Sequence, residues 1–258
     1  LGNTNPPGHT FPTCHIGFYL NGRDPVEVRA VASGRIRTVY YNEWSDDNRI
    51  EIEHTSTFLT VFDHVSDLPD GIGTDAELEA GDLLGYGDPA HGAVDLGVVD
   101  YERSLFFVTH ARYHEFEIHC VDPYSAFTPE IRDALLVTNP RTVEPRGGKI
   151  DFDVDGTLSG NWFHESLPVA QSSGFNHASG HLAFIRDDVN PEQIRVTCGG
   201  TLSTAPFDRA VEGNTPDPVT VVQASGAVKY ALVSATPAVI LVQLTGSRSL
   251  RAEVFSNK

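Results

Sequence analysis

The stretch RIEIEHTSTFLTVFDHVSDL, residues 49–68, decides the fold class. Apolar and polar residues alternate in RIEIEH and again in FLTVFDHV. A period of two residues is typical of β-strands that bury one face. The stretch therefore predicts two strands, and short β-rich runs of the same kind recur along most of the chain, with Gly, Asp and Pro between them.

One helix is predicted, over residues 128–137, where the sequence reads TPEIRDALLV. Thr128 is a suitable N-cap, Pro129 stands in the first turn, and an acidic residue follows early. Strands at the spacing seen elsewhere are typical of sandwiches and barrels. We therefore predict an all-β protein with this single short helix.

The chain is predicted to form two domains. The segment from residue 139 to 149, NPRTVEPRGGK, has two prolines, two glycines and no apolar periodicity, which favours a linker. We expect a β domain over residues 1–140, a linker over 141–149, and a second β-barrel or β-sandwich domain over 150–258.

Charge and hydropathy exclude several classes of function. The 258 residues include 35 acidic and 18 basic side chains, giving a net charge of −17. Nucleic-acid and anionic-lipid partners are not expected, because phosphate binding depends on Lys and Arg. No apolar run approaches the ~20 residues that span a bilayer. The chain begins at Leu1 and contains no Met, which fits either a trimmed chain or a mature exported protein, and we expect an extracellular or periplasmic location.

The three cysteines allow at most one disulfide within the chain. They are Cys14, Cys120 and Cys198. Cys14 and Cys120 are the natural pair if both lie in one domain. Their spacing matches no zinc knuckle, so the cysteines indicate no metal site.

Four motifs follow one another in the first 100 residues: FPTCHIGFYL, AVASGRI, IEIEHTSTFLTVFDHVSDL and LEAGDLLGYGD. In this order they resemble the M23 or LytM family of zinc endopeptidases, which cleave peptidoglycan cross-bridges. The resemblance covers residues 9–101. It implies an M23-like antiparallel β-sandwich for the first domain.

The resemblance also implies a site. His15 would be the first metal ligand, and the family's second ligand, an Asp four residues later, is replaced by Tyr19. His64 matches the family's catalytic histidine, which assists the attacking water. A His–Tyr pair can also abstract and donate protons, so Tyr19 is a second catalytic candidate beside His64.

The family's closing His-x-His should fall in AVDLGVV, residues 93–99, which contains no histidine. Asp95 and Gly97 stand there in one register, and Val94 and Leu96 in the other. Asp95 is therefore the second candidate metal ligand beside His15. A catalytic zinc needs about three protein ligands and an open position for water, so the sequence predicts a degenerate zinc site in the first domain.

Two motifs bear on the second domain. DFDVDG, residues 151–156, allows a calcium site at Asp151, Asp153 and Asp155, or an amphipathic strand with its Asp residues facing outward. LSGNWF resembles the Gly-x-Trp opening strand of lipocalin-like barrels, and this resemblance implies a barrel that could hold an apolar ligand.

Two hypotheses follow for the whole chain. In the first, a peptidase-like groove has lost standard zinc catalysis and binds a polymer such as cell-wall glycan or peptide, or carries repurposed hydrolytic chemistry. In the second, the protein is an active zinc-dependent hydrolase with substituted ligands. The partner is a polymeric or small-molecule ligand in both, and the oligomeric state stays open.

Overall fold

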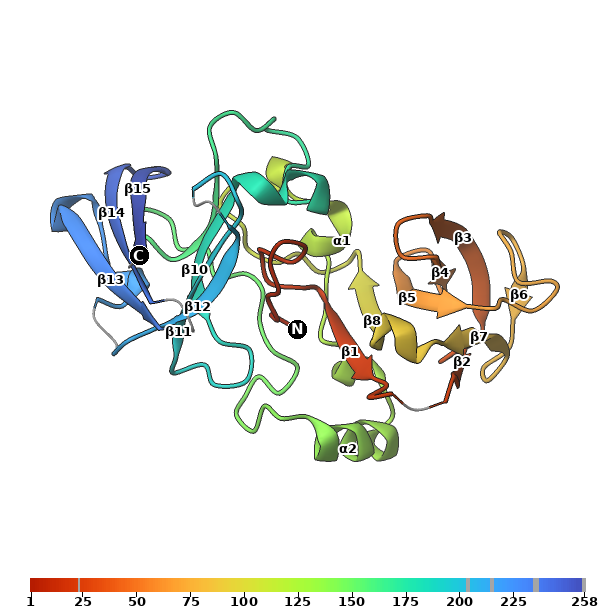
Figure 1. Cartoon of the computed structure of the whole chain (residues 1–258). Coiled ribbons are helices and arrows are strands. Elements are labelled where there is room, and N and C mark those ends of the chain that lie inside the picture. Colours follow the sequence, from red (N-terminus) through yellow and green to blue (C-terminus); the bar gives the residue numbers. More distant parts are fainter. Residues whose placement is uncertain (23, 203–204, 214–215, 234–236, 257–258) are drawn as a thin grey trace. The chain divides into compact units, whose positions relative to one another are not determined.

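The structure is a computed structural model that describes residues 1–22, 24–202, 205–213, 216–233 and 237–256. The chain forms two compact units, each with one antiparallel sheet (Figure 1), which confirms the all-β fold class. Unit 1 comprises Leu1–Thr13, Leu105–Ile118 and Thr138–Lys258. Unit 2 comprises Cys14–Ser104 and His119–Val137.

Unit 2 is built on an eight-stranded sheet. Its strands are β1 (His15–Tyr19), β2 (Val26–Arg29), β3 (Gly34–Asn42), β4 (Asp47–Glu53), β5 (Phe58–Ser66), β6 (Glu77–Leu78), β7 (Leu83–Gly87) and β8 (Ala93–Asp100). They lie side by side in the order β1-β8-β5-β4-β3-β6, and β7 pairs with both β2 and β5. The strands predicted from residues 49–68 are β4 and β5, which pair with each other.

One face of this sheet carries the hydrophobic core of unit 2. Ile50 and Ile52 of β4 are fully buried there, together with Phe62 of β5 and Leu96 of β8. The alternating residues of the same strands point to the opposite face, because side chains alternate along a strand. That opposite face is the one that carries the polar residues discussed below.

Unit 1 contains a seven-stranded sheet whose strands lie side by side in chain order. They are β9 (Gly160–Phe163), β10 (His181–Arg186), β11 (Ile194–Cys198), β12 (Phe207–Val211), β13 (Ala227–Val233), β14 (Ala238–Gly246) and β15 (Ser249–Ser256). The GNWF motif forms β9, and Trp162 packs in the core of this sheet. Strands β9 and β15 are the two ends of the sheet.

Helices are few and short. The predicted helix is α2 (Pro129–Thr138), within one residue of the expected range at each end. Arg132 N donates to Thr128 O, as expected when Thr128 precedes the first turn. Helix α1 (Glu115–Ile118) is a single turn. Short 3₁₀ turns lie at Pro89–His91, His110–Arg112, Pro123–Ala126, Phe175–Gly180, Pro218–Thr220 and Gln223–Ser225.

The compact units differ from the predicted ranges in three segments. The predicted linker, residues 141–149, lies within unit 1 together with residues 138–140, and its buried Arg141 donates to the carbonyl oxygens of Pro145 and Asp188.

The other two segments lie earlier in the chain. Residues 1–13 and 105–118 belong to unit 1, with the C-terminal half of the chain. Phe11 stacks on His181 of β10 with ring centroids 4.0 Å apart. Tyr113 packs edge-on against Phe163 of β9 at 5.7 Å. These aromatic contacts attach both segments to the sheet of unit 1, and neither segment has a periodicity that would reveal this.

The predicted readings of residues 151–156 are both corrected. The segment contains no strand. Asp153 is buried and accepts from Asn161 N at 2.9 Å and Val108 N at 3.1 Å. Asp151 Oδ1 lies 2.5 Å from Lys149 Nζ, and Asp155 is exposed in a turn. The three carboxylates therefore have different surroundings, and a calcium site has no support.

The cysteines are all free. Cys14 and Cys120 lie in the same unit, but Cys120 Sγ donates to the carbonyl oxygen of Cys14 at 3.3 Å. The expected Cys14–Cys120 disulfide is therefore not formed. Cys198 is buried in the core of unit 1.

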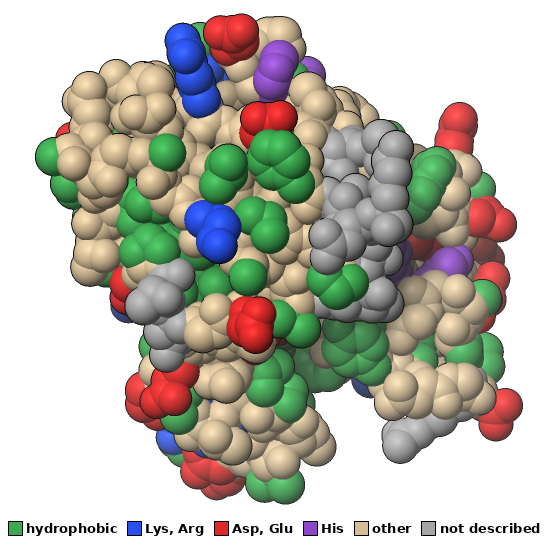
Figure 2. Space-filling view, turned by 60° about the vertical axis from the view of Figure 1, so that its left-hand side comes forward, with side chains coloured by type: hydrophobic (Ala, Val, Ile, Leu, Met, Phe, Trp, Pro, Cys, Tyr) green, Lys and Arg blue, Asp and Glu red, His purple; other side chains and the backbone are tan. Residues whose placement is uncertain are grey.

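Acidic side chains outnumber basic ones on the surface shown in Figure 2, where Lys and Arg are few and isolated. The imbalance lies mainly in unit 2, which contains 21 of the 35 acidic residues and 7 of the 18 Lys and Arg. Within the described ranges, no helix has the length and hydrophobicity needed to cross a bilayer.

Candidate functional site

A row of residues crosses the sheet of unit 2 on the face opposite its hydrophobic core. Tyr40 of β3 pairs with Arg49 of β4. Asp95 of β8 pairs on one side with Asp63 of β5 and on the other with Gly17 of β1. Arg49 joins the two halves, because its Nη1 lies 3.0 Å from Asp63 Oδ2. Directly paired residues of antiparallel strands share a face, so these five residues form one line, which we call the polar row.

Strand β5 is irregular where it meets the polar row. Its pairing with β4 shifts register between Asn48 and Ile50, and His64 has a φ of 66°, which residues other than Gly seldom adopt. Asp63 and His64 both reach polar-row residues, and the fully buried Val65 returns to the core. The irregularity thus places two successive side chains on one face. Bulges and strained residues of this kind are often found at functional sites.

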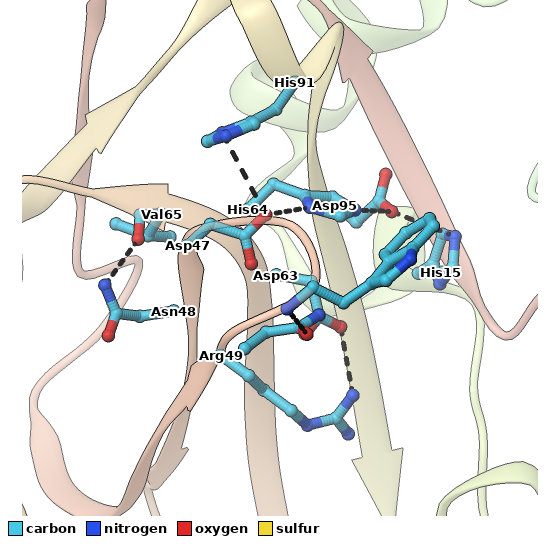
Figure 3. A network of polar contacts seen from close by, with 11 residues as sticks. His15, Asp47, Asn48, Arg49, Asp63, His64, Val65, His91 and Asp95 are labelled. Carbon is cyan, nitrogen blue, oxygen red and sulfur yellow. Dashed lines mark hydrogen bonds and ion pairs between the residues drawn. The ribbon is translucent and has the colours of Figure 1, made fainter.

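The Nδ1 side of the His64 ring contacts a buried carboxylate. Its Nδ1 lies 2.6 Å from Oδ2 of Asp47, whose side chain is 3% exposed (Figure 3). His91 Nδ1 lies 4.0 Å from the same oxygen. Burial lowers the pKa of His64, but the hydrogen bond and charge of Asp47 outweigh it, and the net pKa is raised. Asp47 accepts a hydrogen bond from Nδ1, and His64 Nε2 faces Asp95.

The carboxylate of Asp95 lies between two imidazoles, as Figure 3 shows. Its Oδ2 is 3.2 Å from His15 Nε2 and 3.7 Å from His64 Nε2. Burial raises the pKa of Asp95 to about 6, against an opposing effect of His64. The carboxylate of Asp95 therefore titrates close to the range of histidine, and Asp95 and His64 titrate as an interacting pair.

Arg49 is the cation of the polar row. Its Nε lies 3.2 Å from Glu51 Oε1, and its Nη1 bonds Asp63. Burial raises the pKa of Asp63, and the charge of Arg49 lowers it in part. Arg49 thus offsets two carboxylates, whereas Asp47 and Asp95 face histidines.

Tyr19 lies on the same face but outside this network of polar contacts, as far as the described residues show. Its side chain is exposed, with 66% of its surface accessible. Its Cε2 lies 3.8 Å from the point where a Cβ on Gly17 would stand, and Asp95 Oδ1 lies 3.1 Å from that point. The ring therefore covers Gly17 next to Asp95, and the missing side chain of Gly17 leaves room beside the carboxylate.

The residues present do not form a zinc site with three protein ligands, which is the site that the M23-type motif would require. Asp95 lies on the polar face and Gly97 pairs with His15, whereas Val94 and Leu96 are buried in the core, which settles the register. Gly97 has no side chain to offer. The described part of the chain contains no group of three His, Cys, Asp or Glu side chains that could hold a metal. His15 and Asp95, the two predicted ligands, instead contact each other directly.

The sequence thus indicated four residues of this face, His15, Tyr19, His64 and Asp95, and the structure brings three of them into contact. Nothing in the sequence pattern indicated Asp47, because a carboxylate next to a turn is normally solvated. Arg49 and Asp63 alternate with apolar neighbours, which placed them on the polar face but did not show that they bond each other.

No family model and no curated protein matches this chain. Among solved structures, the chain is similar to the antimicrobial peptidase lysostaphin from Staphylococcus simulans, with a TM-score of 0.36, 14% identity, and coverage of 84% of this chain and 88% of that one. It is also similar to the catalytic domain of the prophage-encoded M23 protein EnpA from Enterococcus faecalis (TM-score 0.30, 14% identity, 39% and 78% coverage).

A third similar structure is cbpa from L. salivarius REN, with a TM-score of 0.30 and 20% identity. The match covers 38% of this chain and spans 65% of that chain. At these values the comparisons assign no family, and the functional argument rests on the residues of the site.

Proposed function

We propose that unit 2 binds a polymeric ligand, cell-wall glycan or peptide, on its polar face, and that this face is a degenerate form of an M23-type zinc site. The observation that carries the proposal is the position of Asp95. Its carboxylate contacts both His15 and His64, with no side chain at Gly97 to complete a metal site. A carboxylate bonded to imidazoles offers acceptors to hydroxyl and amide groups of a ligand.

The shape of the polar row favours an extended ligand. The row crosses five adjacent strands, which corresponds to roughly 19 Å at ~4.8 Å between neighbouring strands. An exposed Tyr40 stands at one end, and Tyr19 covers Gly17 at the other. Aromatic rings with a polar edge suit the apolar faces of sugars and peptide side chains. We place this function outside the cytoplasm, in agreement with a cell-wall ligand.

Zinc binding tests the degenerate site. We expect calorimetric titration of the full chain with zinc to show no tight one-to-one binding, and His15→Ala to give the same weak isotherm as the wild type. Tight one-to-one binding that His15→Ala abolishes would show a working metal site and would overturn this part of the proposal.

Binding to purified peptidoglycan sacculi tests the ligand. We expect the protein to sediment with sacculi in the presence of a chelator. Gly17→Leu should weaken binding, because the added side chain would stand against Asp95 Oδ1. Gly73→Leu is the matched control, since nothing lies within 4 Å of a Cβ at that position. Soluble glycan oligomers and stem peptides used as competitors then separate the two ligand classes.

A second candidate function is hydrolysis with substituted ligands. One observation favours it: buried Asp47 holds His64 Nδ1, so Nε2 points toward the polar row, 3.7 Å from Asp95 Oδ2, as the nitrogen of a general base would point toward a substrate. This hypothesis predicts chelator-sensitive release of peptide from sacculi that is lost in His64→Ala. If no divalent metal supports release, the hypothesis fails and the binding function stands.

A further inference from the structure

The last strand of the sheet in unit 1 has an incompletely covered apolar side. Strand β15 pairs with β14, and β15 is an end strand of the sheet. On the core side of the sheet its residues are partly exposed, whereas the residues that pair with them on β14 are buried, at 2% exposure or less. The pairs are Leu250 with Leu244, Ala252 with Val242, and Val254 with Ile240. A further strand beside β15 would cover these half-exposed residues.

Open space lies beside this edge. A hollow of about 1050 Å³ is lined by Leu250 to Glu253 along β15 and also by Trp162 and Phe163 of β9. Both ends of the sheet therefore curve toward one hollow. Its volume slightly exceeds that of most small-molecule sites, ~300–1,000 Å³, so it offers room for a short extended segment.

One guanidinium ties the two ends of the sheet. Arg248, in the turn between β14 and β15, donates from Nη2 to Asn161 O of β9 at 2.9 Å. Its Cζ lies 4.3 Å from the centroid of the Trp162 ring. This bridge limits how far β9 and β15 can separate. Because Trp162 and Phe163 of β9 line the same hollow as β15, an occupant beside β15 has to fit between the two ends of the sheet, which suits a single strand better than a whole sheet.

The outer side of β15 carries two opposite charges whose directly paired residues on β14 are uncharged. Arg251 pairs across the ladder with Gln243, and Glu253 pairs with Leu241. Both charged side chains are exposed. Opposite charges on directly paired residues stabilise an antiparallel pair, and like charges destabilise it. An incoming strand is therefore selected by the residues that it places opposite Arg251 and Glu253.

We propose that β15 binds an extended peptide segment of a partner protein as an added antiparallel strand. The segment carries an acidic residue opposite Arg251, a basic residue opposite Glu253, and apolar residues opposite Leu250, Ala252 and Val254. Main-chain hydrogen bonds along the unpaired edge supply affinity, and the alternating side chains supply the register. This site lies in unit 1 and is independent of the polar face of unit 2.

A synthetic peptide tests the proposal directly. The peptide SLRAEVF copies residues 249–255. Paired antiparallel to β15 about Ala252, it places its own Arg opposite Glu253 and its own Glu opposite Arg251. We expect one-to-one binding to the full chain by calorimetry. The same peptide with its Arg and Glu exchanged should bind roughly five- to tenfold more weakly, because both charge pairs become repulsive.

A charge-exchanged protein supplies the matched control. Both residues are exposed, so the double variant R251E/E253R should fold as the wild type does, which circular dichroism checks. Its preference should be reversed, in favour of the exchanged peptide.

Two results would overturn the proposal. One is a failed peptide test, meaning either no SLRAEVF binding up to about 1 mM or an unchanged preference in the double variant. The other is self-association of the wild-type chain in sedimentation velocity that R251E abolishes and R251E/E253R restores, because the occupant would then be a second copy of the chain.

Discussion

His64 Nδ1 lies 2.6 Å from Oδ2 of Asp47, seventeen positions earlier in the chain. This contact joins the start of β4 to the irregular part of β5, and it fixes which nitrogen of His64 faces the polar row. A buried carboxylate behind an imidazole holds the ring in one tautomer and raises the pKa of the ring.

We expect Asp47→Asn to lower the pKa of His64, because it removes the charge that helps to raise this pKa and leaves only a neutral acceptor for Nδ1. Folding raises the pKa of His64. The stabilisation that results is fully present below about pH 6.5, the pKa of an unperturbed histidine, and it is lost as the pH rises through the pKa of His64 in the folded state. Titration of the imidazole by NMR measures the shift. Asp67→Asn, at an exposed position, is the control, and equal His64 pKa values in the two variants would show that Asp47 does not hold the ring.

Asp95→Asn should make the fold more stable than the wild type, and this difference in the free energy of unfolding should grow as the pH rises from about 4 to 6. The pKa of Asp95 is raised to about 6 by burial, so the folded state binds more protons than the unfolded state in this window. Wild-type stability therefore falls through it, and the asparagine variant lacks this loss. The difference should grow by of order 1–3 kcal/mol.

Urea unfolding at a series of pH values measures this difference, with Asp70→Asn as the control for loss of a charge on an exposed turn. A difference that stays constant between pH 4 and 7 would contradict a burial-raised pKa at Asp95.

Arg49→Met should destabilise the fold by about 1–3 kcal/mol at pH 7, because it leaves the partly buried Asp63 and Glu51 without their cation. The loss should be smaller near pH 4, where Asp63 can take up a proton. Arg29→Met is the matched control, since the Arg29–Glu27 pair is about half exposed and is worth roughly 0–1 kcal/mol. Equal losses in the two variants, by chemical denaturation, would argue against a structural role for the Arg49 pairs.

Calcium should not raise the melting temperature of the chain. Asp153→Ala should lower stability by roughly 1–3 kcal/mol with or without calcium, because it removes the acceptor for Asn161 N and Val108 N and a charge 3.6 Å from Arg248. Asp155→Ala, in an exposed turn, should have little effect. Thermal unfolding of each variant in calcium and in a chelator measures these effects. A calcium-dependent rise in melting temperature that Asp155→Ala abolishes would be evidence for the calcium site.

Local patterns were enough to predict much of this molecule. Alternation over residues 49–68 predicted two strands, and capping residues placed the helix over residues 128–137 to within one residue. His15, His64 and Asp95 were found because they stand at fixed positions in motifs. Side-chain direction along a strand depends on neighbours one or two residues away, so the sequence carries this information directly.

The tertiary structure decided everything that depends on which strands meet. The pairing of β1 with β8 put Gly97, without a side chain, opposite His15, and the irregular pairing of β4 with β5 turned His64 toward Asp95. Asp47 became the partner of His64 because β4 begins at Asp47 and its next residue, Asn48, pairs with Val65 of β5. Strand register is fixed by packing between segments far apart in the chain, and the period of a single strand contains no record of its partner.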